Sequence, residues 1–131
     1  MTAKLQAILT EFKADSGTVH LMEGDGQLHL AAAIGIPDPV LRIVQVIPIG
    51  KGMAGLAAER RAPVTACNIQ TDNTGDVRPG ARATGLEGAI ALPMLRDGRV
   101  AGVLGVANHR ERTFTAAEVD RLLELASHLA G

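Results

Sequence analysis

The residues best suited to chemistry in this chain are one cysteine and four histidines. Cys67 is either a reactive thiol or, more commonly for a lone cysteine, a small buried hydrophobe. A single cysteine excludes an internal disulfide, which predicts a cytoplasmic location. His20, His29, His109 and His128 show no metal-ligand spacing, whereas a transition-metal site needs three or four ligands. We therefore expect no metal and no cofactor, and we expect His20, inside an apolar run, to be a hydrogen-bonded core residue.

No catalytic group is predicted, because no Ser–His–Asp order or pair of carboxylates stands out. The run Gly50–Gly55 has the form G-x-G-x-x-G, the fingerprint of dinucleotide sites. Its context differs, because Pro48 precedes it and only seven residues separate Gly55 from Pro63. We interpret it as a tight turn that opens a short helix, whose first amides at Gly52–Ala54 are able to hold an anionic group.

Two arginines, Arg78 and Arg82, lie in a stretch without periodicity, Ile69–Glu87, which we interpret as a long loop of the kind that often forms a lid. A solvated loop is the simpler interpretation of these arginines. If the ligand is anionic, they are the first candidates to bind it, because the guanidinium group matches carboxylates and phosphates.

The elements that position these residues alternate between short helices and strands. The predicted helices cover 4–14, 38–44, with Asp38 as the N-cap, and 53–60, followed by a C-terminal helix after Thr115. The predicted strands cover 18–23, 27–33, 46–49, with Pro48 marking an edge or a strand end, and 64–68, followed by a hairpin from Gly88 to Asn108.

The hairpin and the helix after it carry the strongest local signals. Asp97-Gly98 between two apolar runs predicts a tight turn, because both residues tolerate positive φ. Thr115 and Glu118 have the spacing of a capping box, and Phe114 precedes them as a hydrophobic staple. Both faces of the hairpin are apolar, which predicts strands in the middle of a sheet with layers on each side.

Small side chains gather on one face of these strands, namely Ala89, Ala91, Ala101, Gly105 and Ala107. Such a face either lets a helix pack closely or leaves room for a ligand. We expect it to form the floor of a compact pocket, roofed by 53–60 and 69–87. The chain contains two Phe and no Trp or Tyr, so a pocket suited to a small molecule is expected.

Composition limits the class of protein. The chain has 131 residues and a formal charge of −1, which predicts a single domain over 1–131 without the basic face of a nucleic-acid protein. It shows no membrane-spanning run and no signal peptide. At this length there is no room for an output domain, so we expect the chain to act on another protein or to belong to a longer one.

Three stretches resemble one family. Ile49–Glu59 with Ala62-Pro63-Val64 resembles the central helix and following strand of GAF domains, and Gly85–Met94 resembles their next strand. The stretch from Asp97-Gly98 to Phe114-Thr115 resembles their last strand and helix. The resemblance implies an α/β fold of the α+β type. A central antiparallel sheet of five or six strands would have the terminal helices on one face and the short helices and long loop on the other.

The resemblance also implies a function. We expect a non-catalytic sensory domain that binds a small polar or anionic metabolite and relays its occupancy to an output protein or domain. Dimerisation through the terminal helices is frequent in the family, and here a dimer seam would use Ala7, Leu125 or their neighbours. The candidate ligand-binding residues are Gly52, Met53, Cys67, Arg78, Arg82, Gly105 and Ala107.

Two alternatives stay open. The first is a degenerate GAF domain with a filled pocket that serves as a dimerisation module. The second is an enzyme related to free methionine-(R)-sulfoxide reductases. The missing partner cysteines argue against it, and by resemblance the acidic strand positions of those enzymes fall at Gly105 and Ala107 here. The N-K-x-F-x3-D-E signature of cyclic-nucleotide-binding members is matched only in part, by Asn108, His109, Phe114 and Glu118. The capping box explains Glu118 better.

Overall fold

The two long apolar runs around Asp97-Gly98 fold as the predicted hairpin, formed by β5 (Gly88–Arg96) and β6 (Arg99–Asn108). Asp97 has a φ of 51° and Gly98 a φ of 77°. Two consecutive positive values fit the two-residue turn whose twist matches that of the flanking strands. The hairpin lies in the interior of the sheet, so the prediction from its two apolar faces is confirmed.

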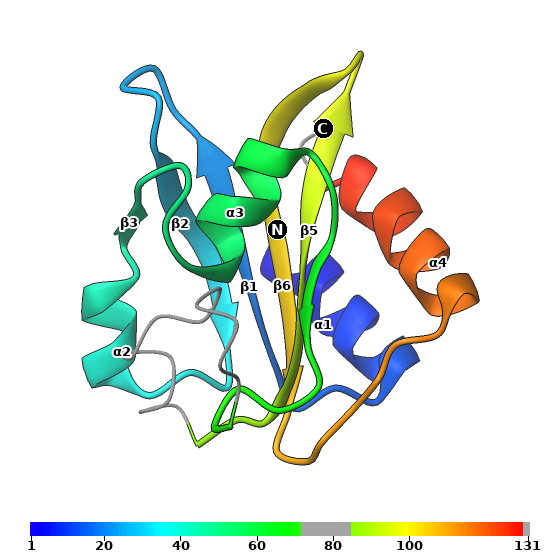
Figure 1. Cartoon of the computed structure of the whole chain (residues 1–131). Helices are drawn as coiled ribbons and strands as arrows, with labels where there is room; N and C mark the ends of the chain where they lie inside the picture. Colours follow the sequence, from blue (N-terminus) through cyan, green and yellow to red (C-terminus); the bar gives the residue numbers. More distant parts are fainter. Residues whose placement is uncertain (72–84, 130–131) are drawn as a thin grey trace.

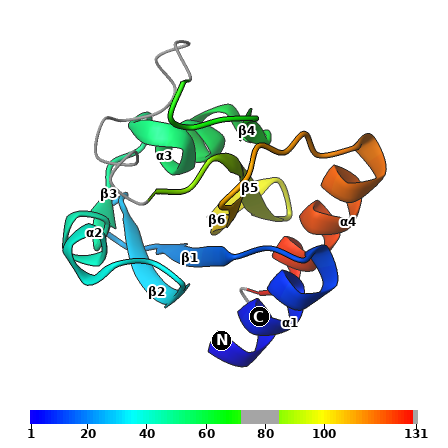
Figure 2. The same cartoon turned by 90° about the horizontal axis from the view of Figure 1, so that it is seen from below.

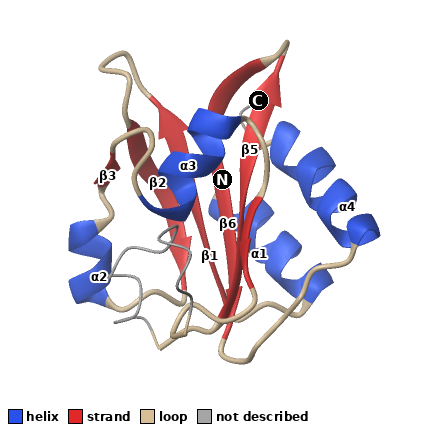
Figure 3. Ribbon diagram, viewed as in Figure 1, coloured by secondary structure: helices blue, strands red, loops and turns tan. Residues whose placement is uncertain are grey.

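A computed structural model describes residues 1–71 and 85–129 (Figure 1). Within them a curled antiparallel sheet of six strands has the order β3-β2-β1-β6-β5-β4. The remaining strands are β1 (Ser16–Met22), β2 (Leu28–Ile34), β3 (Val46–Ile47) and β4 (Val64–Ala66). Every strand pair is antiparallel, as the family resemblance implies (Figure 3). The short strand β3 forms one edge, in agreement with the position of Pro48 directly after it.

Four helices accompany the sheet in the described part of the chain: α1 (Thr2–Phe12), α2 (Asp38–Ile43), α3 (Gly52–Arg60) and α4 (Ala116–Ser127). The terminal helices α1 and α4 lie side by side on one face, and α3 lies on the other (Figure 2). The capping box at the start of α4 is confirmed, because the Thr115 hydroxyl accepts a hydrogen bond from the Glu118 amide and the Glu118 carboxylate accepts one from the Thr115 amide.

Alternation along the central strands divides the core in two. Ile90 and Leu92 of β5 and Leu104 of β6 pack with α1 and α4 in the larger hydrophobic cluster. Their neighbours in sequence, such as Ala91, face α3 instead. The larger side chains of the hairpin therefore gather on the face toward α1 and α4, while Ala89, Ala91 and Ala107 lie with Val103 on the other face.

Some predicted bounds shift by one or two residues. Asp38 is not the N-cap of α2, because Pro37 takes that position and Asp38 begins the helix. The prediction was wrong by one residue, since the N-cap position here carries no side-chain hydrogen bond and so leaves no chemical signal. Most of the predicted loop, residues 72–84, lies outside the described residues. Its two ends lie side by side, because the Ile69 amide donates to the Glu87 carbonyl over 2.6 Å.

Candidate pocket

Two rows of small residues cross the middle of the sheet on the face that carries α3. In one row Thr18 of β1 pairs with Gly105 of β6, which pairs with Ala91 of β5. In the neighbouring row Ser16 pairs with Ala107, which pairs with Ala89. Because these side chains are short, they leave a depression in the sheet surface between the bulkier residues around it. The strand pairing thus creates the floor that the sequence predicted, except for Ala101, which lies at an irregularity in the pairing of β5 and β6 and does not line it.

A pocket of about 140 Å³ lies above this floor. Met53 and Ala54 at the start of α3 border it, together with Ile36 after β2 and Leu86 before β5. The helix is thus part of the roof, as predicted. The other predicted part of the roof, 69–87, contributes Leu86 among its described residues.

The predicted site residues divide into three groups. Met53, Gly105 and Ala107 line the pocket. Gly52 begins α3 with a φ of 67° beside the pocket-lining Met53, and Cys67 follows β4 with an exposed side chain; neither lines the pocket. The remaining two candidates, Arg78 and Arg82, lie outside the described residues.

Two hydroxyl groups supply the polar chemistry of the pocket, and sequence reasoning missed both. Ser16 is fully buried, and within the described part of the chain its Oγ has no hydrogen-bond partner. The Thr18 Oγ1 lies 2.7 Å from the position that a Cβ on Gly105 would occupy, so this hydroxyl stands directly over the glycine. Among the described lining residues none carries a charged side chain. A nonlocal pairing brings these hydroxyls to the floor, and the only local signal is their place on alternate positions of a strand.

The glycine run before the pocket is a turn, as predicted. Gly50 has a φ of 85°, and its amide donates to the Gly55 carbonyl over 2.9 Å. A Cβ on Gly55 would lie 2.4 Å from the Pro48 carbonyl oxygen, so the backbones touch there. The strands that flank α3 lie at opposite edges of the sheet. A dinucleotide-binding unit would place its two strands parallel in the same sheet, so that interpretation does not fit.

His20 is the hydrogen-bonded core residue that the sequence predicts. It is 2% exposed on β1, and its Nε2 lies 2.8 Å from the Val44 carbonyl oxygen at the end of α2. A carbonyl only accepts, so Nε2 carries the proton. The Nδ1 atom of His20 is buried and has no hydrogen-bond partner among the residues that the structure describes. Burial disfavours the charged ring and lowers the pKa of His20 below 6.5, more than the bond to Val44 raises it.

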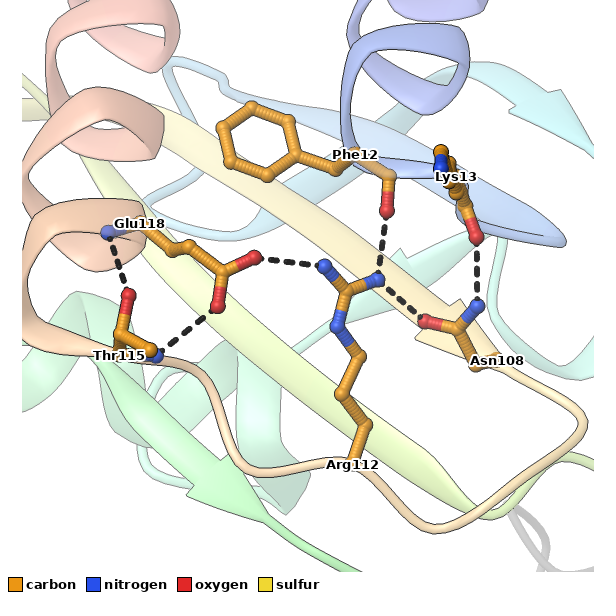
Figure 4. A network of polar contacts seen from close by, with 6 residues as sticks. All are labelled: Phe12, Lys13, Asn108, Arg112, Thr115 and Glu118. Carbon is orange, nitrogen blue, oxygen red and sulfur yellow. Dashed lines mark hydrogen bonds and ion pairs between the residues drawn. The ribbon is translucent and has the colours of Figure 1, made fainter.

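Arg112 ties three elements together just beyond the C-terminal end of β6 (Figure 4). Its guanidinium donates to the Phe12 carbonyl over 2.7 Å, to the Asn108 Oδ1 over 2.9 Å and to the Glu118 carboxylate over 2.7 Å. It also lies 4.5 Å from the centre of the Phe114 ring. Sequence analysis did not single out Arg112, because its partners come from the end of α1, the end of β6 and the start of α4.

This network also assigns the residues of the partial N-K-x-F-x3-D-E signature. Asn108 is buried and donates to the Lys13 carbonyl over 2.9 Å, while Glu118 binds Arg112 and the cap of α4. The hydrogen bond from the Thr115 amide lowers the pKa of the Glu118 carboxyl most, and the bond from Arg112 lowers it further. His109, in the lysine position of the signature, is exposed. The residues hold elements together, and they lie on no part of the described pocket lining.

A curled antiparallel sheet with paired terminal helices on one face and a pocket under a short helix on the other places the chain in a distinct class of α/β domains. The model of the GAF domain family matches residues 1–131, and the chain belongs to this family. The fold predicted from the resemblance is therefore confirmed.

Solved structures agree with this assignment of the fold. The GAF domain region of a putative membrane protein from Geobacter sulfurreducens PCA is 22% identical, with a TM-score of 0.83, over 99% of this chain and 87% of that one. A domain of a putative two-component sensor histidine kinase from Sinorhizobium meliloti 1021 is 19% identical, with a TM-score of 0.77, over 98% of this chain and 84% of that one. The free methionine-R-sulfoxide reductase from Neisseria meningitidis, solved with its substrate, is 22% identical, with a TM-score of 0.77, over 96% and 71%.

No curated protein matches the chain in sequence. Within residues 1–71 and 85–129, none of the helices has the length and apolar character that crossing a membrane requires.

Proposed function

We propose that this chain is a non-catalytic sensory domain that binds a small molecule in the pocket and relays its occupancy to a partner protein or domain. The observation that carries the proposal is the open volume of about 140 Å³ over a floor of small side chains. A degenerate domain would fill this space with larger residues. The likeness to a domain of a putative sensor histidine kinase supports a role in signal transduction.

Gly17 offers a route from the pocket to the terminal helices. It lines the pocket, yet a Cβ on Gly17 would lie 2.8 Å from the Leu9 Cδ2 and 3.0 Å from the Leu5 Cδ1, both on α1. Only the backbone of β1 therefore separates a ligand from the helix. A small shift of this strand on binding would change the packing of α1, which is how occupancy would reach a partner.

Native mass spectrometry of the freshly purified protein tests the proposal. We expect an excess mass that is lost on denaturation. The variant Gly105→Leu fills the pocket and should abolish this excess, whereas Gly24→Leu is a matched control, because a Cβ at Gly24 meets no atom within 4 Å. An excess mass that survives in Gly105→Leu would overturn the assignment of the pocket. Circular dichroism would show that the variant is folded.

A reductase is the second candidate, because the chain resembles the fold of the enzyme from Neisseria meningitidis. We propose that this chain lacks the activity, since its one cysteine cannot close an internal catalytic disulfide. The assay supplies free methionine-R-sulfoxide and dithiothreitol. We expect no turnover of methionine-R-sulfoxide by the parent protein. Turnover by the parent protein that disappears in Cys67→Ser would contradict the proposal.

We also propose that the chain forms a homodimer through its terminal helices. Ala7 of α1 and Leu125 of α4 border a groove of about 200 Å³ with mostly apolar walls, where a second copy would pack. Light scattering at high protein concentration should give the mass of a dimer, and Leu125→Glu should return it to that of a monomer. A monomer in the parent protein would exclude this assembly.

A further inference from the structure

The buried hydroxyl of Ser16 is the feature of the pocket that its packing leaves unexplained. Ser16 is 0% exposed and lines the pocket, and its Oγ has no hydrogen-bond partner among residues 1–71 and 85–129. Buried polar side-chain atoms in native proteins nearly always have a partner, and an unpaired one calls for a specific reason. The neighbouring Gly17 faces α1, so alternation along β1 turns the Ser16 side chain to the pocket face.

Apart from the Thr18 hydroxyl, the side chains of the remaining described lining residues are apolar. Ile36, Met53 and Leu86 form its walls, and alanines and glycines form its floor. A charged ligand group would lose its hydration here without meeting an opposite charge among these residues, which is costly. The described lining therefore disfavours an anion. The sequence-based expectation of a polar or anionic ligand drew on the first amides at Gly52–Ala54 and on Arg78 and Arg82. The structure does not describe these two arginines.

The volume indicates the size of the part of a ligand that the described pocket holds. A cavity of about 150 Å³ with apolar walls is known to hold benzene. The pocket, at about 140 Å³, therefore has room for a body about as large as one six-membered ring. A nucleotide or a long peptide would not fit in the described space.

We propose that the pocket takes an uncharged, mainly apolar molecule of about this size, held at one end by a single hydroxyl or carbonyl group that hydrogen-bonds to Ser16. The inference rests on the proposed binding function and names the chemical class of its ligand. Thr18, two positions along the same face, is the second hydroxyl within the pocket.

Three probes with a common ring test the proposal: phenol, benzene and benzoate, titrated into the isotope-labelled protein and followed by nuclear magnetic resonance. We expect phenol to bind about fivefold to tenfold more tightly than benzene, the effect of one hydrogen bond. Benzoate should bind more weakly than either probe. The largest shifts should fall on residues of the floor, such as Gly105 and Ala107.

The variant Ser16→Ala isolates the hydroxyl. It should remove the advantage of phenol and leave the affinity for benzene unchanged. The control is Ser127→Ala, at a serine that lies on α4 and does not line the pocket, and it should change the affinity for neither phenol nor benzene. Because Ser16→Ala deletes an unpaired buried group, we expect the fold to be preserved. An advantage of phenol that survives in Ser16→Ala would overturn the role of this hydroxyl.

The remaining outcomes separate this inference from the proposed function. If benzoate binds most tightly, or if none of the probes binds, the proposed chemical class is wrong. The binding function still stands in that case if purified protein carries an excess mass that Gly105→Leu abolishes. If that excess is also absent and extracts of small metabolites give no thermal shift, both proposals fall.

Discussion

Replacing Arg112 with Ala should destabilise the domain far more than an ordinary surface substitution. The side chain of Arg112 is only 11% exposed, although it is charged. It joins the end of α1, the end of β6 and the start of α4 through hydrogen bonds to Phe12, Asn108 and Glu118. The substitution therefore removes one donor group and leaves three acceptors without it.

The magnitude follows from the environment of these acceptors. A hydrogen bond that involves a charged group contributes about 1.5–3 kcal/mol, and the three bonds here share one guanidinium, so their losses do not add fully. The Glu118 side chain is 30% exposed and keeps its bond to the Thr115 amide, so water compensates part of its loss. Loss of the guanidinium from the Phe114 ring adds about 0.5–1 kcal/mol. We expect Arg112→Ala to lower the free energy of unfolding by about 3–5 kcal/mol.

Urea unfolding, followed by circular dichroism, measures this loss. Arg112→Lys should lose about half as much, because one ammonium group cannot replace the planar fork of the guanidinium. Arg110→Ala, an exposed arginine two positions away, is the matched control and should change stability by less than about 0.5 kcal/mol. A loss below about 1 kcal/mol in Arg112→Ala would refute the reasoning, because the ion pair would then behave like an exposed one.

Two further predictions concern the sheet. Burial lowers the pKa of His20 in the folded state below 6.5, so the unfolded chain binds the proton more readily. The free energy of unfolding should therefore be full above about pH 6.5 and decrease as the pH falls toward the folded pKa. The decrease should be at most about 1.4 kcal/mol per pH unit. Urea unfolding between pH 7.5 and 5 should show this slope and its loss in His20→Gln, and an unchanged slope in that variant would contradict the role of His20. Gly102→Ala should destabilise the domain by about 1–3 kcal/mol, because its Cβ would lie 2.2 Å from the His20 carbonyl oxygen. Gly24→Ala is the control in the same unfolding assay, and equal stability of the two variants would count against this contact.

Local patterns were sufficient to predict much of the fold. The Asp97-Gly98 turn and the Thr115–Glu118 capping box depend on residues that are neighbours in sequence, and both are present as predicted. The position of Arg112 could not be predicted in the same way. Its bond to the Phe12 carbonyl joins residues that are 100 positions apart, and nothing in the local sequence specifies that partner.

The pocket shows the same division between local and nonlocal information. Gly105 and Ala107 predict free volume on one face of a strand, because the small size of their side chains is known from the sequence itself. The chemistry of that volume depends on which strand lies beside β6, and this neighbour is β1, from the other end of the chain. The pairing of Ser16 with Ala107 and of Thr18 with Gly105 turns an apolar depression into a site with two hydroxyls. Under the proposed binding function, ligand selectivity would arise from the pairing of the first and last strands, and a substitution at Ser16 should alter it without altering the volume that the small residues provide.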